Sequence, residues 1–163
     1  MKIAGFIQDS IVDGPGLRFV LFAQGCPHHC EGCHNPDTHE PDGGREMSEQ
    51  EIIDEMLSNP LTDGITLSGG DPFFQAEECA KIALAAREAG LNVWCYTGYL
   101  LEELISSPNK DWRELLELTD VLVDGRFVLS ERSLNLKWRG SGNQRIISVR
   151  KSLDIGSAVL YDR

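Results

Sequence analysis

The stretch that decides the fold is Gly64–Tyr96, GITLSGGDPFFQAEECAKIALAAREAGLNVWCY. Residues 64–68 predict a short strand, and residues 92–96 predict the next one. Between them, Asp71-Pro72 is a typical N-cap followed by proline at the first helical position, and Gly90 is a typical glycine after a helix C-terminus. Strand, helix and strand in this order predict two parallel strands joined by a right-handed crossover.

The same alternation extends in both directions from this unit. The residue pattern predicts further strands at 17–23, 121–123 and 145–149. It predicts further helices at about 48–59, where Ser48 to Glu51 form a capping box, and at 100–105 and 112–118. About four to six strands fit in 163 residues, which is too few for a closed eight-stranded barrel. We therefore expect an α/β fold with an open parallel sheet, in one domain spanning residues 1–163, with the tail after about residue 150 unassigned.

Composition and charge argue against several classes of function. The chain is 41% hydrophobic and 25% charged, as folded globular proteins are. No apolar stretch approaches the roughly 18 residues of a membrane span, and no secretory signal is recognisable, so we expect a cytoplasmic protein without a membrane partner. The net charge of −11 disfavours binding to nucleic acid. Residues 126–163 nevertheless carry 8 basic and 3 acidic side chains, which form either a solvated face or a docking surface for an anionic partner or cofactor.

Three of the five cysteines lie in residues 26–33, CPHHCEGC, here called the cysteine loop. Thiolates are soft ligands that select zinc, copper(I) or iron–sulfur clusters. A zinc site would need a fourth ligand, which His28, His29 or His34 could supply. A four-iron cluster held by three cysteines would keep one iron open for a substrate. The spacing alone leaves both kinds of site open. The other two cysteines, Cys79 and Cys95, lie in predicted regular structure and are expected to be buried apolar residues.

Four unusual segments each follow a predicted strand. They are the cysteine loop, the turn Ser68-Gly69-Gly70, Thr97-Gly98 and Asp124-Gly125. Ligands of parallel sheets bind at the carboxyl ends of the strands, so we expect these segments to converge on one site. Paired glycines leave backbone groups unshielded and let a ligand approach closely.

At this point the motifs resemble those of a known family. The C-x3-C-x2-C spacing of Cys26, Cys30 and Cys33 is similar to the cluster motif of the radical S-adenosylmethionine enzymes, and Ser68 to Pro72 resemble their glycine-rich motif. Asp13 to Gly16, with Cys33-His34-Asn35, resemble the glycyl-radical-enzyme activases. Val121 to Phe127 and Trp138 to Arg145 resemble the activating proteins of anaerobic (class III) ribonucleoside-triphosphate reductases. The similarity covers about residues 1–149, and the family motif often has Glu where Asp71 stands.

This resemblance implies a partial (β/α) barrel of the radical S-adenosylmethionine type and one [4Fe–4S] cluster per chain, held by Cys26, Cys30 and Cys33. It implies that S-adenosylmethionine binds to residues of the two motifs, namely Gly32, Cys33, His34, Ser68, Gly69, Gly70 and Asp71. It also implies a reaction: one electron from reduced flavodoxin or a similar donor cleaves S-adenosylmethionine to methionine and a 5′-deoxyadenosyl radical. That radical takes a hydrogen from a glycine Cα of the reductase catalytic subunit, in a complex with the reductase dimer. No catalytic side chain beyond the cluster and cofactor is expected.

Two other functions remain open from the sequence. One is a small radical S-adenosylmethionine enzyme acting on a small molecule, such as a 7-carboxy-7-deazaguanine synthase; the Trp138–Arg145 motif speaks against it. The other is a non-catalytic module held by zinc or a cluster.

The sequence also predicts roles for several individual residues. We expect His28 and His29 to be exposed loop residues. We expect His34 to pack against its neighbours or to support an iron ligand, and not to be an iron ligand itself. Thr97 and Asp124 are candidates for the site, although either could be an ordinary cap, as could Asp71. The segment from Arg139 to Arg145 could bind the reductase or the cofactor, or form a structural turn.

Overall fold

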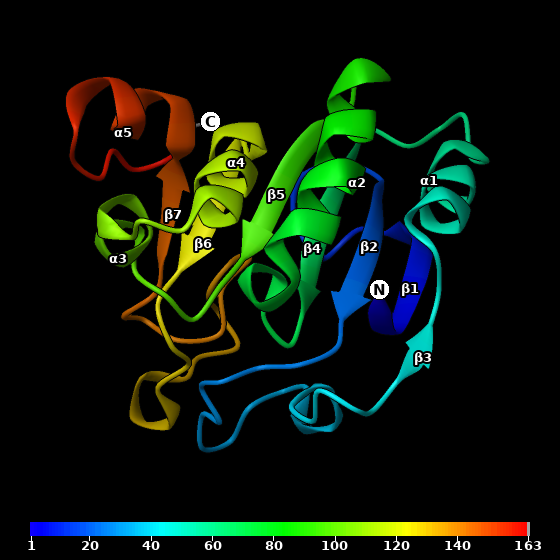
Figure 1. The fold of residues 1–163 in the computed structure, drawn as a ribbon. Coiled ribbons are helices and arrows are strands. Elements are labelled where there is room, and N and C mark those ends of the chain that lie inside the picture. The colour runs from blue at the N-terminus through cyan, green and yellow to red at the C-terminus, as the bar shows by residue number, and fades with distance from the viewer. Residues whose placement is uncertain (163) are drawn as a thin grey trace.

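The computed structural model describes residues 1–162 as one seven-stranded sheet flanked by helices (Figure 1). The strand order is β3-β1-β2-β4-β5-β6-β7. Four parallel strands form the centre: β2 (Arg18–Ala23), β4 (Gly64–Gly69), β5 (Asn92–Tyr96) and β6 (Val121–Asp124). Antiparallel strands form the edges: β1 (Lys2–Ser10) and β3 (Arg45–Glu46) on one side and β7 (Arg145–Ser148) on the other. The sheet is open, because its edge strands β3 and β7 do not pair with each other in the described residues.

The expected open parallel sheet is therefore confirmed for the four central strands, whereas both edges are antiparallel. The segment between β6 and β7 contains only a short 3-10 helix, η3 (Leu129–Glu131), so it forms no crossover and β7 returns antiparallel to β6. Strand β1 was not predicted at all. Its sequence, KIAGFIQDS, alternates poorly, and its pairing with β2 is irregular between Ile3 and Gly5 and again between Ile7 and Ser10.

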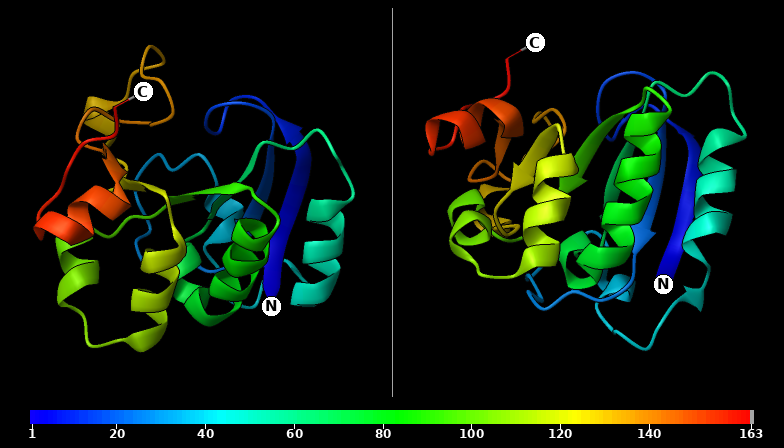
Figure 2. Two further views of the ribbon diagram at one scale, coloured as in Figure 1. Left: turned by 90° about the horizontal axis from the view of Figure 1, so that it is seen from above. Right: turned by 45° about the horizontal axis from the view of Figure 1, so that its top comes forward.

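Helices cover one face of the sheet. They are α1 (Glu49–Leu57), α2 (Ala76–Glu88) and α4 (Lys110–Leu118), which lie side by side in both views of Figure 2. The short helices α3 (Leu101–Ser106) and α5 (Val149–Ile155) lie beyond β6, and α5 occupies the tail left unassigned above. The segment between β6 and β7 and the turn between β1 and β2 project on the side away from the helices (Figure 2).

Local sequence signals place the helix ends. Ser48 Oγ accepts a hydrogen bond from the Glu51 amide at 3.1 Å, so the predicted capping box starts α1. Asp71 caps the 3-10 turn η2 (Pro72–Gln75), which leads into α2, and the Asp71 carboxylate accepts from the Phe73 amide at 3.0 Å. Both predicted starts are confirmed.

The core lies between the helices and the parallel strands. Cys79 of α2 and Cys95 of β5 are fully buried in it, as expected. Burial raises the pKa of both thiols well above the ordinary value. They therefore remain protonated in an apolar environment and act as small hydrophobic residues.

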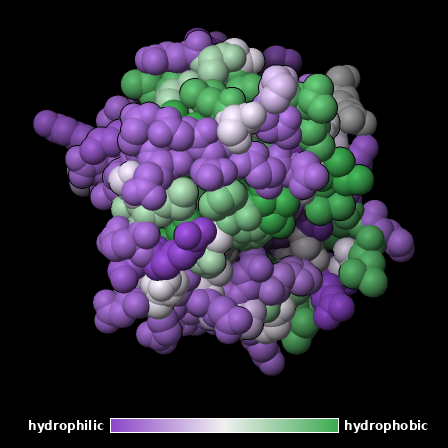
Figure 3. Space-filling view, turned by 90° about the vertical axis from the view of Figure 1, so that its right-hand side faces the viewer, coloured by the Kyte–Doolittle hydropathy of each residue, from purple (hydrophilic) through white to green (hydrophobic). Residues whose placement is uncertain are grey.

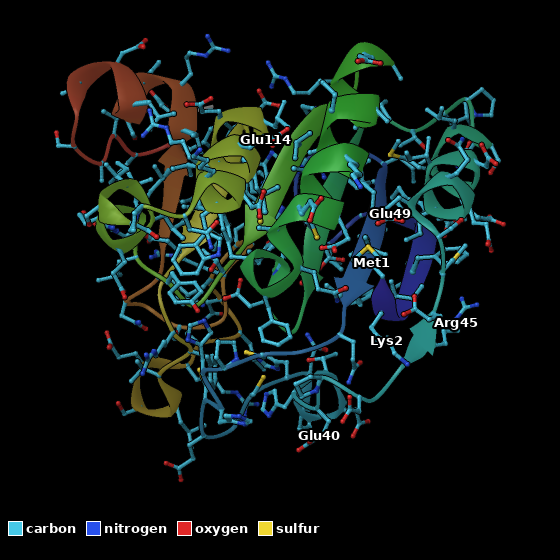
Figure 4. All side chains as sticks on the ribbon, viewed as in Figure 1. Met1, Lys2, Glu40, Arg45, Glu49 and Glu114 are labelled. Atoms are coloured by element: carbon cyan, nitrogen blue, oxygen red, sulfur yellow. The ribbon has the colours of Figure 1, made fainter. Side chains whose placement is uncertain are left out.

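The edge near the N-terminus is tied by short polar contacts. The Met1 ammonium group lies 3.1 Å from the Glu46 carboxylate, and Met1, Lys2 and Arg45 lie close together where β1 meets β3 (Figure 4). Figure 3 views the molecule from this edge, where polar side chains cover most of the surface and apolar ones gather beside a hollow. No helix in residues 1–162 is long and apolar enough to cross a membrane.

Candidate active site

A cavity of about 710 Å³ is lined by the segments that follow the parallel strands. Its walls include all three thiols of the cysteine loop, the turn Ser68 to Gly70, Thr97-Gly98 and Gly125. The expected convergence of these segments at the carboxyl ends of the strands is confirmed. Asp124 does not line the cavity. It is fully buried, accepts from the Leu101 amide at 2.8 Å and pairs with an arginine of β7, so it has the structural role of a cap.

The thiols of Cys26, Cys30 and Cys33 are half-buried on one wall of the cavity, and none is in a disulfide. A turn in which the Cys33 amide donates to the Cys30 carbonyl at 3.2 Å brings these two residues together. Burial is the main cause of the raised pKa of Cys26. Within residues 1–162, no three His, Cys, Asp or Glu side chains surround a single-ion position.

The Asp71 side chain joins three of the converging segments. Its carboxylate is fully buried and accepts from the Gly98 amide at 3.0 Å and from Thr97 Oγ1 at 2.8 Å, in addition to the Phe73 amide. His28 Nε2 donates to the same carboxylate at 2.7 Å. Asp71 is thus an N-cap whose other hydrogen bonds fasten the cysteine loop to the end of β5.

The expectation that His28 is exposed is wrong, because its side chain is only 3% accessible. The imidazole fits between Asp71 and the edge of the Tyr99 ring, whose centre lies 4.5 Å away. Gly98 makes this possible, since a Cβ atom there would overlap the imidazole. The sequence signal that could have revealed the contact is a glycine placed two residues after the end of β5, next to the buried Thr97.

The paired glycines have a packing role, and their expected contact with the cofactor stays a prediction. Gly69 has φ +101°, and a Cβ atom on it would overlap backbone atoms at the end of β2. A Cβ atom on Gly70 would overlap the backbone of Gly25, in the chain that follows β2. The Gly70 amide donates to the Ala23 carbonyl at 2.8 Å, so it is not open to a ligand. Both glycines still line the cavity, and their small size lets β4 approach the cysteine loop closely.

Two further histidines lie near the thiols. His34 packs edge-on against Phe127 with ring centres 5.1 Å apart, in agreement with the expected packing role. His39, which sequence reasoning missed, lines the cavity and has a buried Nε2 without a hydrogen-bond partner. The backbone carbonyl of His39 accepts from the Cys26 amide at 3.1 Å.

Residues 126–144, here called the strap, form a further wall. The strap is held by its own hydrogen bonds: the Arg139 guanidinium donates to the carbonyls of Gly142 at 3.2 Å and Gln144 at 2.7 Å. Tyr96 Oη donates to the Trp138 carbonyl at 2.6 Å and ties the strap to β5. These contacts favour the structural interpretation of the segment from Arg139 to Arg145.

Arg145 at the end of this segment is also structural. It lies 2.6 Å from the Asp124 carboxylate and 2.7 Å from that of Glu102. The hydrogen bonds to Asp124 and Glu102 raise the pKa of Arg145, and the bond from Arg145 lowers the pKa of Glu102.

The donor set fits an iron–sulfur cluster. Three soft thiols face one cavity, while Cys79 and Cys95 lie in the core and do not line it. His28, one of the histidines that could supply a fourth ligand, is already bound to a carboxylate through Nε2.

Comparison with known proteins agrees with this donor set. A protein family described as a 4Fe-4S single cluster domain matches residues 12–147. The anaerobic ribonucleoside-triphosphate reductase-activating protein of Vibrio cholerae serotype O1 is 39% identical over 144 residues, 83% of this chain and 90% of that protein. The proteins of the same name from Escherichia coli K12 and Enterobacteria phage T4 are each 37% identical, over 150 and 145 residues, covering 86% and 84% of this chain and 94% and 87% of theirs.

The chain belongs to this family of activating proteins. The family resemblance that the motifs indicated is thereby confirmed. The matched region contains the cysteine loop, the glycine turn and the strap, so every wall of the cavity lies within it.

Proposed function

We propose that this chain activates an anaerobic ribonucleoside-triphosphate reductase by generating a glycyl radical on its catalytic subunit. The observation that carries the proposal is the gathering of Cys26, Cys30 and Cys33 on one wall of a single cavity, in a member of this family. The names of the relatives support the reductase as the partner.

In this proposal the three thiolates hold a [4Fe–4S] cluster, and the cavity beside it receives S-adenosylmethionine. A cluster held there would supply one-electron reductive cleavage of S-adenosylmethionine to methionine and a 5′-deoxyadenosyl radical, with the electron coming from reduced flavodoxin or a similar donor and the radical taking the glycine hydrogen. Such bound groups supply the reactive chemistry, while the protein supplies position and exclusion of water.

The residues of the chain have defined tasks in this scheme. Cys33, His34 and the turn Ser68 to Gly70 line the cavity and would form the cofactor-facing wall. Gly32 precedes Cys33 in the chain but does not itself line the cavity. Asp71 has its carboxylate already occupied by four protein donors, so it positions the cofactor-binding turn rather than contacting the cofactor. The cavity volume of about 710 Å³ lies within the range of small-molecule sites.

The experiment is reconstitution with iron and sulfide without oxygen, followed by dithionite and S-adenosylmethionine. We expect 5′-deoxyadenosine to form with the wild-type chain and not with Cys30→Ala. Cys79→Ala is the matched control, because it removes a thiol outside the cavity and should keep both the cluster and the reaction. Addition of the reductase should produce the electron spin resonance signal of a glycyl radical. Full cluster loading in Cys30→Ala would contradict the proposal. So would a product derived, without the reductase, from an added small molecule other than S-adenosylmethionine.

A further inference from the structure

Exposed apolar side chains surround the cavity on two sides. In the described residues, only four large apolar side chains are more than 70% exposed: Ile11, Val12, Leu61 and Leu134. Val12, in the turn between β1 and β2, and Leu134, in the strap, both line the cavity, so they lie where it opens to solvent. Ile11 adjoins Val12 in the chain. Two of the four most exposed apolar residues therefore line one opening, with a third next to one of them in the chain, and gathered exposed apolar surface is typical of an interaction site.

Two arginine side chains without an ion pair in the described residues lie beside this opening. Arg126 and Arg132 are exposed residues of the strap, and neither side chain forms an ion pair within residues 1–162. Arg132 lines the cavity, and Arg126 lies in the chain between two residues that do. The chain carries a net charge of −11, and against this background two arginines without an ion pair lie beside one opening, which Asp13 also lines.

The remaining basic residues of the strap have local partners. Arg139 donates to backbone carbonyls, as described above, and Lys137 lies over the Trp138 ring with its Nζ 4.4 Å from the ring centre. The strap is therefore fixed by its own contacts, and Arg126 and Arg132 are not needed to hold it. Their side chains are available to a partner.

We infer that Val12, Arg126, Arg132 and Leu134, here called the rim, are the docking surface for an acidic segment of the reductase that also carries apolar side chains. The inference rests on the proposed function, in which a glycine of the partner must reach the cavity and so must pass this opening. The arginines attract and orient the segment by charge, and the apolar side chains are buried when it docks.

The test is the affinity of the full-length chain for the reductase, measured without oxygen at low and at physiological salt. The test variant is Arg126→Glu combined with Arg132→Glu. The matched control is Arg150→Glu combined with Lys151→Glu, which makes the same change of charge on exposed residues of α5, outside the cavity. We expect the dissociation constant to rise about tenfold or more in the rim variant at low salt, and little in the control. Leu134→Ser should weaken binding at both salt concentrations, because it removes apolar contact area.

The yield of glycyl radical separates this inference from the proposed function. In the rim variant we expect the yield to fall at low reductase concentration and to recover when the reductase is in excess, as a docking defect requires. Equal affinities of the rim variant and the wild type, or an equal loss in the control, would overturn the inference. So would a rim variant that lost affinity for S-adenosylmethionine and kept its affinity for the reductase, because the arginines would then be cofactor contacts. A wild-type chain that bound the reductase but produced no glycyl radical would instead contradict the proposed function.

Discussion

Asp71→Asn is the substitution that most directly tests how the site is held together. One carboxylate oxygen accepts from the Phe73 amide, and the other accepts from the Gly98 amide and from His28. A carboxamide has only one oxygen. In either orientation of the new side chain, its NH₂ group would face the amide of Phe73 or of Gly98, which would then lose the acceptor that it has in the wild type.

The expected cost follows from that arrangement. A buried donor left without a partner costs about 1–3 kcal/mol. For a chain of this size, about 2 kcal/mol corresponds to a fall in the melting temperature of roughly 4–8 °C. The cysteine loop should also lose its fastening to β5, because His28 holds it through this carboxylate.

The assay is urea unfolding of the metal-free, reduced protein, together with the rate at which a chelator removes iron from the loaded protein. Asp42→Asn is the matched control, since Asp42 is exposed and outside the site. Asp71→Asn should lower the free energy of unfolding and speed iron loss, and the control should do neither. If Asp71→Asn unfolded like the wild type, the carboxylate would not be the hub that the geometry indicates.

One further prediction concerns a close contact in the site, and two concern the buried cysteines. Gly98→Ala should destabilise the metal-free protein by about 1–3 kcal/mol, because the new Cβ would overlap His28. Its effect should be less than additive with that of Asp71→Asn, because both changes disturb the same contact. An unchanged free energy of unfolding in urea would contradict this. A thiol reagent should modify three cysteines of the native metal-free protein quickly and Cys79 and Cys95 only on unfolding; five fast thiols would contradict their burial. Above about pH 8.5 the unfolded chain loses protons from the Cys79 and Cys95 thiols, while the folded chain keeps them. The free energy of unfolding should therefore fall as the pH rises, by up to about 1.4 kcal/mol per thiol and pH unit. Replacing both cysteines by Ala should flatten this dependence on pH in urea unfolding.

Elements with strong local signals were predictable from the sequence. The helix starts at Ser48 and Asp71 depend on side chains that bond to amides two or three residues away, so local sequence specifies them. The convergence of the cavity segments was predictable for a different reason. Parallel strands joined by crossovers bring their carboxyl ends to one edge, whatever the side chains are.

Features that depend on distant contacts were not predictable. The burial of His28 requires a carboxylate 43 residues away and the absence of a side chain at Gly98. Strand β1 is held by pairing with β2 and by its place at an edge, while its own sequence contains Gly5 and three polar residues near its end. In both cases the local sequence carries little signal, because the stabilising partners lie far along the chain.

The central claim is that three thiols of the cysteine loop bind a four-iron cluster with one iron left open for S-adenosylmethionine. The most direct measurement is the electron spin resonance spectrum of the reduced, reconstituted protein with and without S-adenosylmethionine, alongside its iron content. We expect about four iron ions per chain and a spectrum that changes when S-adenosylmethionine is added. A spectrum that stays the same, or a cluster that survives the loss of any one loop cysteine and is lost with Cys79 or Cys95, would contradict the claim.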